Sequence, residues 1–216
     1  MIEVFGWAAA ALGVSSSLPQ LVRILRSDTS AGVSLTLWQL VAAATTAWAV
    51  HGYVSGAPQM QIPNVLLTLA SFAIVIFVAR DRRLPLGRTL LMPLGVAVVL
   101  AGINVWLGPV VFGFAVVVPQ LVGQFSQLRE LVTAPVIEGV SGAYLAIILL
   151  VQSMWFGFGM VKPDWALIIC AGLMTLSCIA NLAVYLVRRL RSTRSADVVA
   201  ARRPLRAGLH SRHGVS

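Results

Sequence analysis

Residues 29–79 read TSAGVSLTLWQLVAAATTAWAVHGYVSGAPQMQIPNVLLTLASFAIVIFVA, a stretch of 51 residues without Asp, Glu, Lys or Arg. A helix needs about 20 apolar residues to cross the hydrocarbon core of a bilayer. The stretch is therefore long enough for two crossings, and the turn-forming triplet Gly56-Ala57-Pro58 divides it. It predicts two membrane-spanning helices joined by a short turn.

The same alternation of uncharged runs and short turns extends through most of the chain. Residues 89–128 form a second uncharged run, which Gly108-Pro109 divides. Of the 216 residues, 58% are hydrophobic and only 11% are charged, whereas a typical soluble domain has about 25% charged residues. This composition excludes an ordinary soluble enzyme and a disordered chain. It predicts seven spans, at residues 4–25, 33–55, 61–80, 88–106, 109–128, 139–160 and 165–188.

The basic residues predict how the chain is oriented. Cytoplasmic loops of membrane proteins carry an excess of Lys and Arg. Here one set of alternating connections, with the C-terminal tail, holds 15 Arg, and the other set holds only Lys162. We expect a multi-pass protein of the cell membrane with its N-terminus outside and its C-terminus in the cytoplasm. The basic tail, residues 191–216, is expected to be disordered and to face lipid rather than nucleic acid.

An internal repeat organises the spans. Pro19-Gln20-Leu21-Val22 recurs 100 residues later as Pro119-Gln120-Leu121-Val122, and Gly32-Val33-Ser34 recurs 107 residues later as Gly139-Val140-Ser141. At the offset of 107, Trp48 meets Trp155, Gly52 meets Gly159, and Thr68-Leu69 meets Thr175-Leu176. These collinear matches indicate that spans 1–3 and spans 5–7 are copies of one unit. The odd linker span between them gives both copies the same orientation, as in transporters built from parallel repeats.

The predicted fold is thus an all-α integral membrane protein with seven transmembrane helices, arranged as two parallel three-helix bundles and a linker helix (3+1+3). In transporters of this kind, substrate sites lie between the halves near the middle of the membrane. The predicted parts are a first repeat at 1–83, a linker helix at 84–107, a second repeat at 108–190 and the basic tail at 191–216.

Three motifs resemble a known family. They are the Pro-Gln pair near the cytoplasmic end of the first helix of each unit, the Gly-Val-Ser that opens the second helix, and Ile62-Pro63-Asn64, which opens the third. Together they resemble the PQ-loop superfamily and, within it, the SWEET sugar transporters, over about residues 1–190. The resemblance implies a facilitator, or uniporter, that moves a small sugar down its gradient by alternating access.

The two Pro-Gln pairs are the expected gating hinge. Proline removes one backbone hydrogen bond and softens a helix. The resemblance implies that Pro19-Gln20 and Pro119-Gln120 bend their helices to close a cytoplasmic gate. The alternative is a static kink, because proline is common in spanning helices.

The resemblance also implies a substrate pocket. Trp48 and Asn64 map onto pocket positions of the first unit, and Trp155 maps onto one of the second. Tryptophan offers an apolar face to a sugar ring, and asparagine can bind its hydroxyl groups without adding charge. The second unit departs from this pattern, because Ala171 stands at the position equivalent to Asn64 and the nearest amide on that helix is Asn181. Further polar candidates are Thr46, Gln152 and Ser153.

The sequence contains no nucleophile triad, no metal-ligand spacing and no nucleotide-binding loop, so we expect neither an enzyme nor a bound metal or cofactor. Two other functions stay open: a PQ-loop carrier of an amino acid or another small metabolite, and a PQ-loop receptor or scaffold that does not transport. Carriers that are driven by protons need an ionisable side chain within the membrane. Apart from thiols and tyrosines, His51 is the only such side chain well inside a span, and it lies close to the outer turn. We therefore expect passive transport. The expected partners are a small-molecule substrate and the bilayer, and a homo-oligomer is left open.

Overall fold

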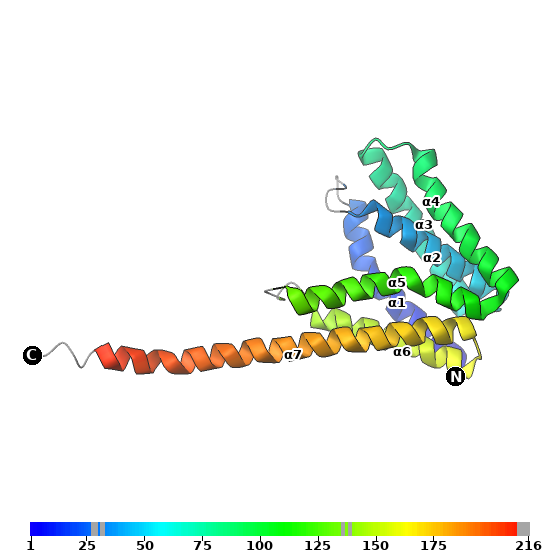
Figure 1. Cartoon of the computed structure of the whole chain (residues 1–216). Helices are drawn as coiled ribbons and strands as arrows, with labels where there is room; N and C mark the ends of the chain where they lie inside the picture. Colours follow the sequence, from blue (N-terminus) through cyan, green and yellow to red (C-terminus); the bar gives the residue numbers. More distant parts are fainter. Residues whose placement is uncertain (27–29, 31–32, 135–136, 138–139, 211–216) are drawn as a thin grey trace, which may run out of the picture.

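The computed structural model describes residues 1–210 apart from 27–29, 31–32, 135–136 and 138–139, with the backbone alone at 16–21, 23–25 and 192–210. The described residues are helical and contain no β-strand (Figure 1). In chain order the elements are α1 (Ile2–Arg26), α2 (Leu35–Val54), α3 (Pro58–Asp81), α4 (Leu86–Gly102), the π-helical turn η1 (Ile103–Leu107), α5 (Gly108–Thr133), α6 (Gly142–Val161) and α7 (Trp165–His210).

Four helical segments of the described chain are long and apolar enough to cross a membrane: Pro58–Asp81, Leu86–Thr133, Gly142–Val161 and Trp165–Arg191. This confirms the prediction of an all-helical protein with membrane-spanning helices. The helix α2 is not among these segments, and its 20 residues include the polar side chains of Gln39, Thr45, Thr46 and His51.

The glycine-containing breaks lie where the sequence predicts turns. Gly56 has φ +66° between α2 and α3, and Gly108 has φ +85° where α5 begins. Residues with a Cβ rarely adopt this left-handed conformation, so both positions favour glycine. Figure 1 shows α4 and α5 meeting at a sharp corner at the second of these breaks. Each uncharged run is therefore folded back on itself at its glycine.

The helices form two sets that pack in the same way. In the first set α3 contacts both α1 and α2, and in the second set α7 contacts both α5 and α6. The sets meet where α1 contacts α6 and, less extensively, where α2 contacts α5, while α4 lies against α2. Since lipid tails are as apolar as leucine, such helices associate through close packing. The buried residues Ala47, Phe112, Val116, Ala166 and Cys170 belong to one cluster that joins α2, α5 and α7.

The bounds of the helices repeat at the offset found in the sequence. The helices α2 and α6 both have 20 residues, and their first residues, 35 and 142, and last residues, 54 and 161, differ by 107. The helices α3 and α7 start at 58 and 165, again 107 apart. Ser34 caps α2 by accepting a hydrogen bond from Leu37 N at 3.3 Å, and Ser141 caps α6 by accepting one from Tyr144 N at 3.2 Å. The serines of the two Gly-Val-Ser motifs thus start their helices through the same cap.

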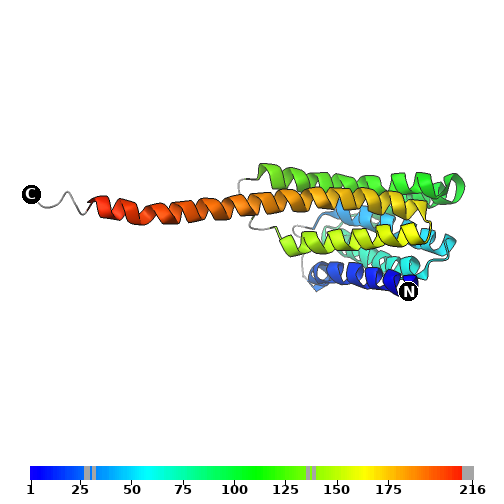
Figure 2. The ribbon, with the colours of Figure 1, turned by 90° about the horizontal axis from the view of Figure 1, so that it is seen from below.

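The C-terminal part differs from the prediction. The backbone of α7 stays helical through His210 and extends well beyond the other helices (Figures 1 and 2), although residues 191–216 were expected to be disordered. Arg and Ala, which have high helix propensities, are the most frequent residues of 191–210, and the helix continues past Pro204. A helix already formed in the membrane also supplies the nucleus that an isolated segment lacks.

Candidate functional site

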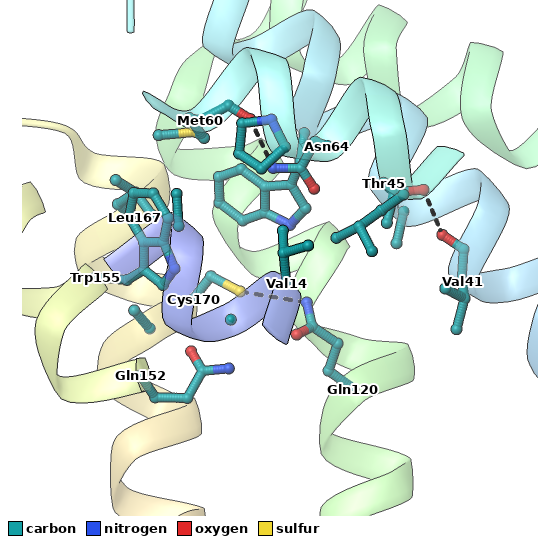
Figure 3. Close-up of a pocket in the computed structure, with 17 residues that line it drawn as sticks. Val14, Val41, Thr45, Met60, Asn64, Gln120, Gln152, Trp155, Leu167 and Cys170 are labelled. Carbon is teal, nitrogen blue, oxygen red and sulfur yellow. Dashed lines mark hydrogen bonds between the residues drawn. The ribbon is translucent and has the colours of Figure 1, made fainter. Parts of the chain in front are cut away.

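A cavity of about 300 Å³ lies between the two sets of helices, lined by residues of α1, α2, α3, α5, α6 and α7 (Figure 3). We call it the central cavity. None of the 17 described residues that line it is charged. The side chains that matter for its chemistry are Trp48, Asn64, Gln120, Gln152, Trp155 and Ala171.

The structure brings the three residues of the predicted substrate pocket to the central cavity. Trp48 comes from α2, Asn64 from α3 and Trp155 from α6, so both sets of helices contribute. Ala171, which replaces the second asparagine, also lines this cavity. That these residues bind a substrate stays a prediction, but they share one uncharged space.

The two tryptophans are each held by aromatic neighbours. The Trp48 ring meets His51 at 5.5 Å and Phe112 at 5.2 Å between centroids, both edge-on. The Trp155 ring meets Phe158 edge-on at 5.8 Å. Edge-to-face contacts of this kind favour one orientation of the rings. Both tryptophans thus pack edge-on against aromatic rings beside the cavity that they line.

The polar groups of the first set are partly engaged within their own helices. Asn64 Nδ2 donates to the carbonyl of Met60 at 2.8 Å. The hydroxyl of Thr45 donates to the carbonyl of Val41 at 2.9 Å and accepts a hydrogen bond from Thr68 at 3.0 Å. No donor within the described chain bonds to Asn64 Oδ1. This oxygen is the acceptor that the first set offers to a ligand.

Of the predicted gating hinge, the structure describes the pair in α5. Pro119 lies inside α5 without ending the helix. Gln120 Nε2 donates to the carbonyl of Val116 at 3.2 Å and lies 3.5 Å from Cys170 Sγ. The side chains of Pro19 and Gln20 are outside the described residues, although their backbone belongs to α1. Bending at either pair stays a prediction.

Gln120 lies between the central cavity and a second cavity of about 480 Å³, which we call the inner cavity. The two cavities share Val41, Ala44 and Gln120. The inner cavity extends along α5 past Gln127 and reaches Tyr144 near the start of α6. It therefore lies toward the end of the molecule where the sequence places the cytoplasm.

The opposite end of the site is closed by a buried polar contact between the two sets of helices. His51 Nε2 lies 2.9 Å from Asp164 Oδ2, and His51 Nδ1 lies 2.9 Å from Asn104 Oδ1. His51 is 3% exposed and Asn104 is 5% exposed. Asp164 also caps α7 by accepting a hydrogen bond from Leu167 N at 3.2 Å. One histidine thus connects α2, η1 and the start of α7.

A second ion pair strengthens this closed end. Lys162 pairs with Glu3 and so connects the turn before α7 to the start of α1. The Lys162 ammonium also lies 5.7 Å from the centroid of the Phe158 ring. Exposed pairs contribute little by themselves. Here the pair adds to the buried contact of His51 with Asp164, and both contacts bridge the two sets of helices.

Sequence reasoning missed the partners of His51. Asp164 directly precedes the predicted span 165–188, and neither it nor Asn104 was given a role. The only signal that could have pointed to this contact is the ionisable His51 within a span. Sequence reasoning also left Asn181 open as a replacement amide for Ala171. In the structure Asn181 Nδ2 donates to Gln124 Oε1 at 2.8 Å, away from the central cavity. The amide that does line the central cavity from the second set is Gln152 of α6.

No protein-family model and no curated protein matches the chain. The described residues contain no group of three or more His, Cys, Asp or Glu that could hold a metal ion. Because a fold alone does not define a function, the function has to be inferred from the residues of the site.

Proposed function

We propose that the protein is a membrane facilitator of the SWEET type that moves a small neutral sugar down its gradient. The main support for this proposal is that Trp48, Asn64 and Trp155 line one uncharged cavity between the two sets of helices. Aromatic faces combined with a few polar groups are what a polar ring needs for binding. Because no charge lines the cavity, the substrate needs no countercharge.

The arrangement that we propose is the 3+1+3 fold of seven transmembrane helices. The helices α1–α3 form the first repeat, α4 with η1 forms the linker, and α5–α7 form the second repeat. The matching bounds of α2 and α6 and their matching serine caps support this assignment. The N-terminus lies outside and the C-terminus in the cytoplasm of a cell membrane, because 15 of the 16 basic residues fall on one side.

The two ends of the central cavity differ, and this difference supports alternating access. The central cavity shares lining residues with the inner cavity, whereas His51, Asp164, Lys162 and Glu3 join the two sets at the other end. This arrangement corresponds to a conformer that is closed toward the outside. Rocking of the two sets, with bending at the Pro-Gln pairs, exposes the same cavity to the other side.

A carrier of amino acids is the second candidate for this fold. A zwitterion in the membrane interior requires charged or strongly polar partners, because an unpaired charge there is costly. The described lining of the central cavity supplies none. The absence of such partners favours a neutral substrate over an amino acid.

Counterflow in proteoliposomes tests the function. The labelled probes are D-glucose, D-galactose, D-fructose, sucrose, leucine and glutamate, with no ion gradient imposed. We expect exchange of at least one monosaccharide and none of the amino acids. Exchange of an amino acid without any sugar, or no exchange of any probe, would overturn the proposal.

Cysteine labelling tests the orientation. The native cysteines, Cys170 and Cys178, are buried, so their reaction with an impermeant thiol reagent should be slow. Ser55 and Gly87 are exposed and lie at opposite ends of the helices, and a Cβ at Gly87 would meet no atom within 4 Å. In intact cells Ser55→Cys should react from outside and Gly87→Cys should not. The reverse pattern would contradict the proposed orientation.

A further inference from the structure

The two sets of helices place their cavity-lining amides at different repeat positions. At the offset of 107, Thr45 corresponds to Gln152 and Asn64 corresponds to Ala171. All four residues line the central cavity. The first set therefore has a hydroxyl group on α2 and an amide on α3, while the second has an amide on α6 and a methyl group on α7.

The hydrogen bonding of these groups differs as well. The Thr45 hydroxyl is engaged by Val41 and Thr68. The side-chain amide of Gln152 has no hydrogen-bond partner in the described part of the chain. Figure 3 shows this amide pointing into the cavity on the side where Gln120 also lies. Gln152 is half-buried, and a ligand in the cavity can bind both the donor and the acceptor of its amide.

The amide donors of Asn181 and Gln120 in the second set are already engaged. Asn181 Nδ2 bonds to Gln124 and to the carbonyl of Ser177. Gln120 Nε2 is held by the carbonyl of Val116 beside Cys170. Among the described amides of α5, α6 and α7 that line the central cavity, Gln152 thus has both its donor and its acceptor available.

We propose that Gln152 determines specificity by replacing the amide that Ala171 lacks, so that each set of helices binds the substrate through one amide. This inference rests on the proposed function and names the substrate class more closely. The ligand is a neutral, single-ring polyhydroxyl molecule that lies against Trp48 or Trp155. It meets Asn64 at one edge and Gln152 at another. The cavity of about 300 Å³ favours one ring over two, because it lies at the small end of ligand pockets.

The test exchanges the residues between repeat positions. Gln152→Thr gives α6 the residue that α2 carries, and it should raise KM for the best-transported hexose of the counterflow panel about tenfold, since one hydrogen bond is lost. Adding Ala171→Asn to Gln152→Thr restores an amide at the position equivalent to Asn64 and should recover most of the affinity. Ser153, although a polar candidate from the sequence, is exposed and does not line the central cavity. Ser153→Ala is therefore the matched control and should leave KM unchanged.

Deoxy analogues separate recognition from a merely structural role. The wild type should discriminate against one monodeoxy form of that hexose, the one that lacks the hydroxyl group bound by Gln152. The variant Gln152→Thr should lose this discrimination while keeping that against the other analogues. This selectivity compares substrates on the same protein and is independent of the amount of folded variant.

The outcomes distinguish the two proposals. If the wild type exchanges no sugar, the proposed function and this inference both fail. If the wild type exchanges the hexose but Gln152→Thr keeps the same KM and the same discrimination, only the role of Gln152 fails. Failure of Ala171→Asn to improve the affinity of Gln152→Thr would likewise overturn the exchange of amides between the repeat positions.

Discussion

His51 and Asp164 join the two sets of helices by a polar contact, and their repeat counterparts join them by an apolar one. At the offset of 107, His51 corresponds to Phe158 and Asp164 corresponds to Ala57. Phe158 and Ala57 lie together in a buried cluster with Met60 and Leu167. The contact of Trp48 with His51 likewise corresponds to that of Trp155 with Phe158, and both are edge-on. Equivalent positions of the two sets thus hold a polar contact in one case and an apolar contact in the other.

At the other end of the molecule, an arginine binds the backbone near the corresponding loop of each set. In the first set, Arg82 donates to the hydroxyl of Ser30 at 3.0 Å and to the carbonyl of Val33 at 2.6 Å. In the second set, Arg188 donates to the carbonyls of Leu131 and Ala134, each at 2.7 Å. Arg82 directly follows α3 and Arg188 lies within α7, and each binds backbone carbonyls near the connection between the first and second helices of its set. The two arginines are not counterparts at the offset of 107. Helix starts and the packing of the helices thus follow the repeat, while the residue types that make the contacts between the two sets do not.

The largest expected effect comes from removing the paired tryptophans. Trp48→Ala and Trp155→Ala should each reduce counterflow at least about tenfold, because each removes a large stacking surface from the cavity. If the two halves contribute alike, the losses should be similar. Uptake by proteoliposomes with matched protein content measures them. Normal uptake by both variants would remove the central cavity as the substrate site.

The next effect tests the polar contact at the closed end. Asp164→Asn keeps an oxygen that can cap α7 but removes the charge that faces His51. In this variant the closed end of the site should open about tenfold more often, because the buried His51 loses its carboxylate partner. An impermeant thiol reagent applied outside should then react faster with Ala44→Cys, in a background with Cys170 and Cys178 replaced by alanine. An unchanged rate would mean that Asp164 serves only as a cap.

A paired variant sharpens the same comparison. His51→Phe combined with Asp164→Ala gives the polar contact the residue types of its counterpart, Phe158 with Ala57. Because buried ion pairs can often be replaced by apolar residues of similar size, labelling of Ala44→Cys should return toward the wild-type rate. Labelling as fast as in Asp164→Asn would show that the two contacts are not interchangeable.

A smaller effect separates two equivalent glycines. A Cβ at Gly52 would lie 2.5 Å from the backbone nitrogen of Gln61, whereas one at Gly159 would lie 2.9 Å from the Cβ of Leu167. Backbone yields less easily than a side chain. Gly52→Ala should therefore lower the melting temperature in detergent more than Gly159→Ala, with a cost of about 2 kcal/mol for the former. Equal losses would contradict the closer packing of α2 on α3.

The smallest effect concerns the two serine caps. Ser34→Ala and Ser141→Ala should each cost about 1 kcal/mol, because each removes one capping hydrogen bond. The two costs should agree, since the caps have the same geometry. Unfolding in denaturant and detergent measures both, with Ser153→Ala as a control outside the caps. A clear inequality would show that the repeat does not extend to the energetics of its helix starts.

Much of this architecture could be predicted because it depends on local signals. Uncharged runs, the breaks at Gly56 and Gly108 and the serine caps all act within a few residues. The repeat then brought Trp48 and Trp155 into register, and the structure places both at one cavity. Asn64 was placed in the pocket by the family resemblance, and in the structure it lines this cavity.

The remaining features depend on contacts between distant elements. His51 and Asp164 are 113 residues apart and are not repeat counterparts, so no periodicity connects them. Whether Gln152 or Asn181 faces the cavity depends on how α6 and α7 are rotated against α5, which composition does not determine. The helical tail was missed for another reason. Its high charge suggested disorder, but its backbone continues α7, whose apolar first part is already helical.

The helix α7 is much longer than one membrane crossing requires. Its 46 residues at 1.5 Å each extend about 69 Å, whereas the hydrocarbon core is about 30 Å thick. The 19 residues from 192 to 210 form an arm of about 28 Å beyond the apolar part, so a tilt of about 10° would sweep its far end through about 5 Å. In the proposed facilitator, a small rotation of the second set of helices would therefore move the end of this arm farther than the residues around the cavity.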